Sequence, residues 1–271
     1  MSADMTDLAP LTTSRALAAQ AWLDVREPLD RQLSPLGLQA MDALRLLSGE
    51  TVVDVGCGAG QTLLQLAERV GADGRIVGVD ISAPLLDAAR SQASGDSRIT
   101  CVESDATDLG LPSRSVDAFF SRFGVMALPD HAAAFANFHR MLKPDGRIAF
   151  VCWRSLVENE LDLLPLRAAR LEHLVDPTPF SFEDPGYARD VLERAGFKTV
   201  SIRAHDEAVS CGDLEATSAV LLKVGALGRI LRENPALRAE AEPRVRAALM
   251  ALGDPATVAL KAATWIVTAQ A

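Results

Sequence analysis

Three glycines at alternate positions, Gly56, Gly58 and Gly60, follow a short apolar run that ends in VVDV. A glycine loop directly after a strand lets a ligand approach the backbone closely. A phosphate-binding loop needs Lys-Ser or Lys-Thr after its glycines, whereas Gln61-Thr62 stand here. The spacing is also GxGxG, not the GxGxxG of dinucleotide-binding loops. The loop therefore disfavours both of these phosphate-bearing ligands.

Carboxylates recur around this loop at the ends of apolar runs. Asp54 stands two places before the first glycine, and Asp80 ends the run RIVGVD. A carboxylate at the end of a second parallel strand can accept hydrogen bonds from both hydroxyls of an unphosphorylated ribose. Asp105 follows the next run, where it could accept a hydrogen bond from an adenine amino group. These acids predict an adenosine site.

The elements that must position these residues alternate between short apolar runs and amphipathic helices. Strands that are apolar on both faces, separated by helices, predict a parallel sheet covered on each side. Residues 12–47 and 213–252 are expected to be helical, the first broken at Pro28 and Pro35 and the second at Asn234-Pro235 and Glu242-Pro243. The expected strands are 51–55, 75–80, 98–104, 115–121, 147–153, 199–209 and 257–270, and the other expected helices are 61–70, 82–93, 131–142, 160–174 and 185–195.

The order DxGxGxG, then an acid ending the second strand, then an acid ending the third, resembles the class I S-adenosylmethionine-dependent methyltransferases. SVDAFFSRFGVMALPD and FANFHRMLKPDGRIAFVCW are similar to that family's fourth and fifth strands and intervening helix. VALKAATWIVTAQ resembles its antiparallel last strand. More narrowly, the chain is similar to the small-molecule branch akin to the ubiquinone/menaquinone-biosynthesis methyltransferases. The resemblance covers about residues 36–210 and 257–270.

This resemblance implies a fold and a division of the chain. The expected fold is α/β, a Rossmann-like doubly wound seven-stranded sheet with an antiparallel last strand, plus N-terminal helices and a helical lid. Residues 1–48 would be a helical segment covering the site, 49–210 and 257–271 the cofactor-binding core, and 211–256 the helical lid insertion.

The resemblance also implies the residues that hold S-adenosylmethionine. The glycines would carry the methionine portion on the backbone, and Asp54 would hold its amino group. Asp80 would take the ribose, and Ile81 would pack on the adenine. The implied cofactor contacts are Asp54, Gly56, Cys57, Gly58, Gly60, Asp80, Ile81, Asp105, Ala106, Ser121 and Arg122.

The implied reaction is in-line methyl transfer to an O-, N- or C-nucleophile of a small molecule, with release of S-adenosylhomocysteine. Such a site mainly aligns the acceptor and excludes water, so it needs no universal catalytic residue. The catalytic residue is left unassigned, since no histidine among His131, His139, His173 and His205 stands out as a base. No Asp-Asn pair follows the fourth strand, so no metal is expected. Predicted acceptor contacts are Trp22, Trp153, Arg154 and Asn159.

The charge and composition of the chain limit the kinds of binding partner that are expected. A formal charge of −9, from 36 acidic and 27 basic residues, disfavours nucleic acid. The N-terminus lacks the apolar core of a secretory signal, and no apolar run approaches the ~18 residues of a membrane span, so the cytoplasm is the expected address. The acceptor and the oligomeric state, a homodimer included, are left open.

Two other functions are also left open. A nicotinamide-dependent oxidoreductase is disfavoured by the glycine spacing and by the lack of a Tyr-x-x-x-Lys pair, since Tyr187 is followed by Ala-Arg-Asp-Val. A non-catalytic S-adenosylmethionine-binding protein would carry the same motifs. A DNA amino-methylating enzyme would show Asn-Pro-Pro or Asp-Pro-Pro after the fourth strand, where SRFG stands.

Overall fold

The computed structural model describes residues 8–271, which fall into two compact units. The sheet unit comprises residues 32–161, 176–209 and 260–271. The helical unit comprises residues 8–31, 162–175 and 210–259 of the described chain.

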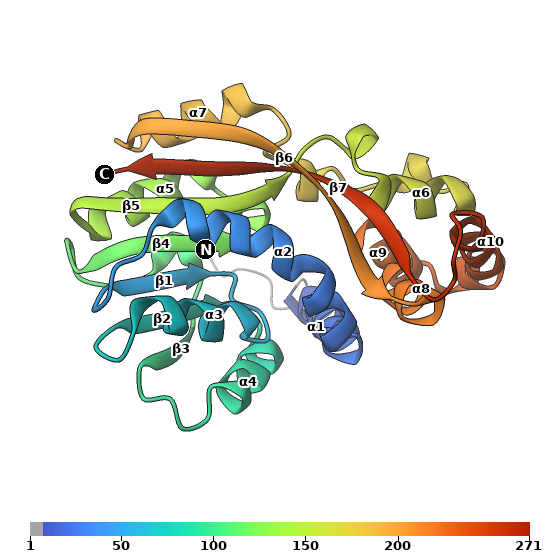
Figure 1. Cartoon of the computed structure of the whole chain (residues 1–271), viewed down its shortest axis with the longest axis horizontal. Helices are drawn as coiled ribbons and strands as arrows, with labels where there is room; N and C mark the ends of the chain where they lie inside the picture. The colour runs from blue at the N-terminus through green and yellow to red at the C-terminus, as the bar shows by residue number, and fades with distance from the viewer. Residues whose placement is uncertain (1–7) are drawn as a thin grey trace. The chain divides into compact units, whose positions relative to one another are not determined.

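Seven strands form one sheet in the order β3-β2-β1-β4-β5-β7-β6 (Figure 1). Strands β1 to β5 pair in parallel, whereas β7 runs antiparallel to β5 from Arg147↔Gln270 to Trp153↔Thr264. This arrangement confirms the predicted fold class. The strands are β1 Thr51–Val55, β2 Arg75–Asp80, β3 Ile99–Glu103, β4 Val116–Arg122, β5 Leu142–Trp153, β6 Lys198–Gly212 and β7 Val258–Gln270.

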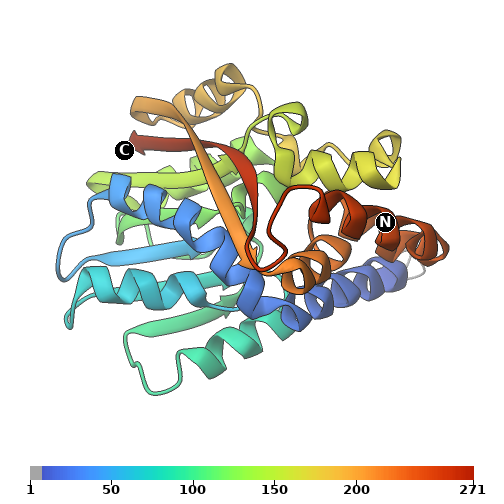
Figure 2. The same cartoon turned by 45° about the vertical axis from the view of Figure 1, so that its right-hand side comes forward.

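Helices alternate with these strands, and α3 and α4 pack on β2 and β3 (Figures 1 and 2). The α-helices are α1 Leu8–Asp24, α2 Arg26–Leu44, α3 Gln61–Val70, α4 Ala83–Gln92, α5 His131–Met141, α6 Glu160–Ala169, α7 Pro185–Arg194, α8 Leu214–Lys223, α9 Gly225–Glu233 and α10 Arg238–Met250. Short 3₁₀ turns are η1 Ala106–Asp108, η2 Val125–Ala127, η3 Leu156–Glu158, η4 Glu172–Leu174, η5 Thr178–Phe180 and η6 Pro235–Leu237.

Side-chain caps explain where two helices of the sheet unit begin. The Asp130 carboxylate accepts a hydrogen bond from the Ala133 N–H at the start of α5, at 2.9 Å. Asp184 accepts one from the Gly186 N–H at the start of α7, at 2.8 Å, with Pro185 in the first helical position. Both caps satisfy N–H groups that have no partner inside the helix.

Two of the predicted helix breaks are wrong. Pro35 lies inside α2 and Pro243 inside α10. A proline in a helix removes one hydrogen bond, but burial of an apolar face can outweigh that loss. Leu36 and Ala40 supply such a face on α2, since neither has exposed surface. A break that was not predicted falls at Val224, between α8 and α9, and is followed by Gly225, whose φ of 74° is left-handed.

The core of the sheet unit is apolar on both faces of its central strands. Val52 and Val53 of β1 are both fully buried, although successive side chains point to opposite faces. The rings of Phe119 and Phe138 stack with their centroids 4.6 Å apart. A sheet covered on both faces has this pattern. Its buried strands hold in place the carboxyl edge of the sheet, where the glycine loop lies.

No helix within residues 8–271 has the length and apolar character to cross a membrane.

Candidate functional site

The glycine loop between β1 and α3 has a backbone that other residues rarely adopt. Gly56, Gly58 and Gly60 have φ values of 72°, 54° and 98°, all left-handed. The N–H groups of Gly56 and Cys57 donate to the Val79 carbonyl of β2, at 2.8 and 3.1 Å. The loop is therefore anchored on the neighbouring strand at the carboxyl edge of the sheet.

The three glycines differ in what surrounds them. A Cβ atom at Gly56 would lie 2.7 Å from the Gly124 Cα, and one at Gly60 would lie 2.9 Å from Ala89 of α4. A Cβ at Gly58 would meet nothing within 4 Å. The outer glycines thus permit close packing, whereas the middle glycine presents its backbone to open space.

Substitutions at Gly56 and Gly58 should separate these two roles. Gly56→Ala should lower the free energy of unfolding by at least ~2 kcal/mol, because its methyl group would overlap a backbone atom. Gly58→Ala should cost only about 1 kcal/mol of stability. It should nevertheless weaken binding of S-adenosylhomocysteine by roughly tenfold, because the methyl group would stand where a ligand reaches the loop. Thermal unfolding and calorimetry measure the two effects.

Gly95→Ala is the matched control for the change at Gly58. Gly95 also has a left-handed φ, 91°, and its Cβ would also meet nothing within 4 Å. It lies between α4 and β3, outside the glycine loop. Equal binding of S-adenosylhomocysteine by the two variants would contradict a ligand at Gly58.

Asp54 is a fully buried carboxylate immediately before the loop, with no exposed surface. The Thr62 hydroxyl of α3 donates to its Oδ2 atom. Its Oδ1 atom is buried and accepts no hydrogen bond from a described residue. Burial raises the pKa of Asp54 to about 7, against the positive charge of Arg122, which lowers it. A buried, unsatisfied acceptor is costly to the protein and suits a ligand that donates.

Asp80 lies against the same loop from the end of β2. Its Oδ2 accepts a hydrogen bond from the Gly58 N–H at 3.0 Å, and its Oδ1 accepts one from the Ser82 N–H at 2.9 Å. Burial raises its pKa, and these backbone donors oppose the rise. The next residue, Ile81, is 51% exposed although it is a large apolar side chain. The acid and the exposed side chain thus lie together beside the middle glycine.

Asp105 and Ala106 follow β3, the strand next to β2. Asp105 caps η1 by accepting hydrogen bonds from the Thr107 N–H at 2.8 Å and the Thr107 hydroxyl at 2.7 Å. Ala106 is buried. Asp105 therefore caps this turn, and its contact with adenine stays a prediction. Cys57 is also buried, which raises the pKa of its thiol, so only its backbone is available to a ligand.

Ser121 ties the end of β4 to the end of β1. Its hydroxyl donates to the Val55 carbonyl at 2.7 Å and accepts hydrogen bonds from the N–H groups of Gly124 and Val125, at 3.1 and 3.2 Å. The side chain is fully buried. Its hydrogen-bonding capacity is used by the backbone, so it holds the loop after β4 beside the glycine loop.

Arg122, the last residue of β4, is directed toward the start of α3. Its Nη1 atom donates to the Gln61 side chain. A Cβ atom at Gly37 of α2 would lie 2.9 Å from the Arg122 Cδ, so this glycine leaves room for the arginine. The guanidinium therefore contributes positive charge near Asp54 and the glycine loop.

The predicted acceptor contacts Trp153, Arg154 and Asn159 all belong to the sheet unit. The ring of Trp153 stacks on Phe123 with centroids 4.0 Å apart and is 9% exposed. Phe123 was missed in the sequence, where its only signal is an aromatic residue in SRFG after a strand. Trp22, on α1 of the helical unit, is 37% exposed, and its contact with an acceptor stays a prediction.

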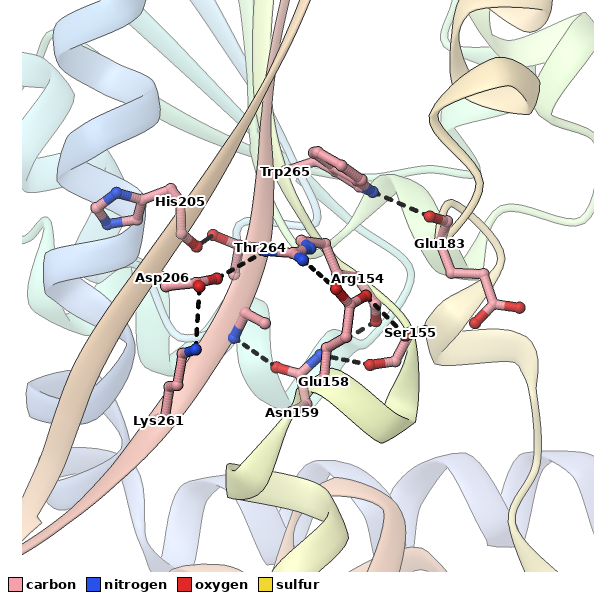
Figure 3. A network of polar contacts seen from close by, with 11 residues as sticks. Arg154, Ser155, Glu158, Asn159, Glu183, His205, Asp206, Lys261, Thr264 and Trp265 are labelled. Carbon is pink, nitrogen blue, oxygen red and sulfur yellow. Dashed lines mark hydrogen bonds and ion pairs between the residues drawn. The ribbon is translucent and has the colours of Figure 1, made fainter.

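Arg154 lies in a polar network, in which Figure 3 shows it between Glu158 and Asp206. It forms ion pairs with both acids, at 2.7 Å to Asp206, and its guanidinium lies 5.1 Å from the Trp265 ring centroid. The side chain is only 17% exposed. Lys261 of β7 also pairs with Asp206, at 3.1 Å. Arg154 thus links the end of β5 to β6 and β7, and its charge is compensated within the protein.

Asn159 closes the turn that contains Arg154. Its Nδ2 donates to the carbonyls of Arg154 and Ser155, both at 3.1 Å, and its Oδ1 accepts a hydrogen bond from the Ala263 N–H at 2.8 Å (Figure 3). It has no exposed surface. The polar atoms of Asn159 are engaged with backbone, so the structure supports a positioning role for this side chain.

The histidines do not reveal a base. His131 Nδ1 lies 2.9 Å from the Tyr187 hydroxyl, and burial lowers its pKa. His205 Nε2 lies 2.8 Å from Glu207 of the same strand, and His139 packs on Phe197. Within residues 8–271, no group of three His, Cys, Asp or Glu side chains is placed to hold a metal ion. Metal independence stays a prediction, and the catalytic residue stays unassigned.

Several known proteins are similar to this chain in sequence. A family model described as a methyltransferase domain matches residues 53–150. Aklanonic acid methyltransferase from a Streptomyces species is 37% identical over 119 residues, which are 43% of this chain and 54% of the relative. Nocamycin O-methyltransferase from Saccharothrix syringae is 31% identical over 185 residues, 61% of this chain and 65% of the relative. The chain thus spans about half to two thirds of the length of these relatives.

Solved structures support the fold alone. The YcgJ protein of Bacillus subtilis matches with a TM-score of 0.58 and 17% identity, covering 87% of this chain and 97% of that protein. A phosphoethanolamine N-methyltransferase of Haemonchus contortus, solved with S-adenosylhomocysteine, matches with a TM-score of 0.56 and 17% identity, covering 87% of this chain and 52% of that protein. The family match, the strand order and the motifs agree. Residues 53–150 of this chain therefore match a methyltransferase domain, and they lie in a sheet with the strand order of a Rossmann-like fold.

Proposed function

We propose that this protein transfers the methyl group of S-adenosylmethionine to a small-molecule nucleophile and releases S-adenosylhomocysteine. One observation carries the proposal: the Asp80 carboxylate is hydrogen-bonded to the N–H of Gly58, the glycine whose Cβ side is open. This contact supports Asp80 as the acceptor for ribose hydroxyls, because the carboxylate lies beside a backbone surface that a ligand can reach. The family match supports the proposal over residues 53–150.

The residues present fit the chemistry of this cofactor. Asp54 offers an unsatisfied carboxylate oxygen to an ammonium group, and Arg122 offers positive charge to a carboxylate. Asp80 can accept from ribose hydroxyls, and the exposed side chain of Ile81 can pack on an adenine. Together they match the two ends of S-adenosylmethionine, an amino acid and an adenosine.

The cofactor would supply an activated methyl group, because its sulfonium makes neutral S-adenosylhomocysteine a good leaving group. The protein then has to hold the acceptor in line with the methyl carbon and keep water away. A hydroxyl or carbon acid of high pKa would also require a base. The buried loop anchors, with Ser121 at their centre, keep the site rigid enough for such alignment.

The names of the relatives support a small-molecule acceptor. Their names specify aklanonic acid, nocamycin and, for a relative from Nostoc, 2-phytyl-1,4-naphtoquinone. The net charge of −9 also argues against a nucleic acid. A cytoplasmic location stays a prediction, and the oligomeric state stays open.

The proposal is tested with methyl-labelled S-adenosylmethionine and a panel of phenols, quinols, amines and carboxylates. We expect label transfer to at least one class, with equimolar S-adenosylhomocysteine, and far slower transfer with Asp80→Ala at a subsaturating concentration of S-adenosylmethionine. A protein that binds S-adenosylhomocysteine tightly yet methylates no acceptor in the panel would be a non-catalytic binder instead.

A further inference from the structure

Phe123, directly after β4, has an unusual backbone. Its φ of 63° is left-handed, and it is the one aromatic residue within positions 8–271 with a positive φ. Such a conformation costs an L-residue about 1–2 kcal/mol. Strain of this kind persists where surrounding structure enforces it, and it gathers at ligand sites.

Several contacts enforce this conformation. The Phe123 N–H donates to the Val151 carbonyl at 3.0 Å, which continues the ladder between β4 and β5. The Ser121 hydroxyl holds the N–H groups of the two residues that follow Phe123. On the neighbouring strand end, Trp153 stacks on the ring at 4.0 Å with an interplanar angle of 18°. The ring is therefore fixed as well as the backbone.

The place of this ring links it to the glycine loop. The next residue, Gly124, lies against the loop, since a Cβ atom added at Gly56 would lie 2.7 Å from the Gly124 Cα. Phe123 is thus adjacent in sequence to a residue that contacts the loop proposed to hold the methionine portion. Trp153 is buried, whereas Phe123 keeps part of its surface exposed. A stacked pair with one member accessible presents a flat, rigid apolar surface.

We infer that Phe123, backed by Trp153, is a specificity-determining residue that selects acceptors with a flat conjugated ring. The inference rests on the proposed methyl transfer, because Gly124, the residue next to Phe123, lies against the glycine loop. Offset stacking on a fixed ring favours planar over puckered partners and costs no reorganisation of the protein. The strain at Phe123 is then explained by its role, which is to present the ring at this edge of the sheet.

The test compares two diols in calorimetry with S-adenosylhomocysteine present: naphthalene-1,4-diol, kept reduced, and its saturated counterpart decalin-1,4-diol. We expect the wild type to bind the flat diol at least ~10-fold more tightly, a gain of about 1.4 kcal/mol. Phe123→Gly should abolish that preference, and Phe123→Tyr should retain it. Affinity for S-adenosylhomocysteine should stay within about twofold in all variants, which a merely structural role would not ensure.

Thr199→Gly is the control for relief of backbone strain. Thr199 also has a left-handed φ, 51°, and lies in an exposed position of β6. Its change should leave the preference for the flat diol intact. A wild type that binds both diols equally, or neither, overturns the inference, as does a preference that survives in Phe123→Gly. Failure of S-adenosylhomocysteine itself to bind the wild type would instead overturn the proposed function.

Discussion

Replacing Asp80 by alanine should weaken binding of S-adenosylhomocysteine by about 100-fold, or roughly 3 kcal/mol. Two hydrogen bonds from ribose hydroxyls to a charged acceptor contribute about 1.5–3 kcal/mol each. The variant also loses the acceptor that holds the N–H groups of Gly58 and Ser82. Calorimetry at pH 8 measures the loss, and thermal unfolding confirms that the variant is folded.

Asp87→Ala provides the matched control for Asp80→Ala. Asp87 lies on α4, pairs with Arg90 at the surface, and has a side chain that is 74% exposed. Its loss removes the same chemical group seven residues further along the chain without touching the loop. Unchanged affinity in both variants would show that the ribose assignment is wrong.

The pH dependence of binding should be set by Asp54. Burial raises its pKa to about 7, so a large fraction of the carboxyl is neutral below that pH. A neutral carboxyl cannot pair with the ammonium group of the methionine portion. Affinity for S-adenosylhomocysteine should therefore rise about tenfold between pH 6 and pH 8. Calorimetry across this range measures the rise, and Asp54→Asn should bind weakly with a flat profile.

The ligand and the free protein offer separate controls for this pH effect. Methylthioadenosine lacks the amino acid, so its affinity should not change between pH 6 and pH 8. The stability of the ligand-free protein should change in the opposite sense. The unfolded carboxyl releases its proton near the ordinary value of 3.8, whereas the folded one keeps it to about 7, so stability from this group falls as pH rises through that window. A binding profile that is flat in the wild type would contradict the assignment of Asp54.

The sequence was sufficient to predict the sheet and to predict that Asp80 and the glycine loop lie at the same edge of it. Asp80 and Gly58 are 22 positions apart, yet the Asp80 Oδ2 lies 3.0 Å from the Gly58 nitrogen. Parallel strands bring their carboxyl ends to one edge, so the contact follows from strand order alone. The antiparallel β7 was also predictable, because its apolar run resembles a known last strand.

Arg154 shows why the acceptor contacts were harder to predict. Its partner Asp206 lies 52 positions away on β6, and the pairing depends on how that strand is aligned. In the sequence, a charged residue at the carboxyl end of a strand indicates a ligand contact. Only the fold shows whether a carboxylate of the protein already pairs with that charge. Phe123 was missed for a related reason, since its left-handed backbone arises from contacts with β5 and Ser121.

The most direct test is calorimetric titration of the purified wild-type protein at pH 8 with S-adenosylhomocysteine, and with NAD in parallel. We expect one molecule of S-adenosylhomocysteine to bind per protein chain, with an affinity that is greatly weakened in Asp80→Ala. We expect NAD to give no binding heat. Binding of NAD without binding of S-adenosylhomocysteine would contradict the assignment of the glycine loop to a sulfonium methyl donor.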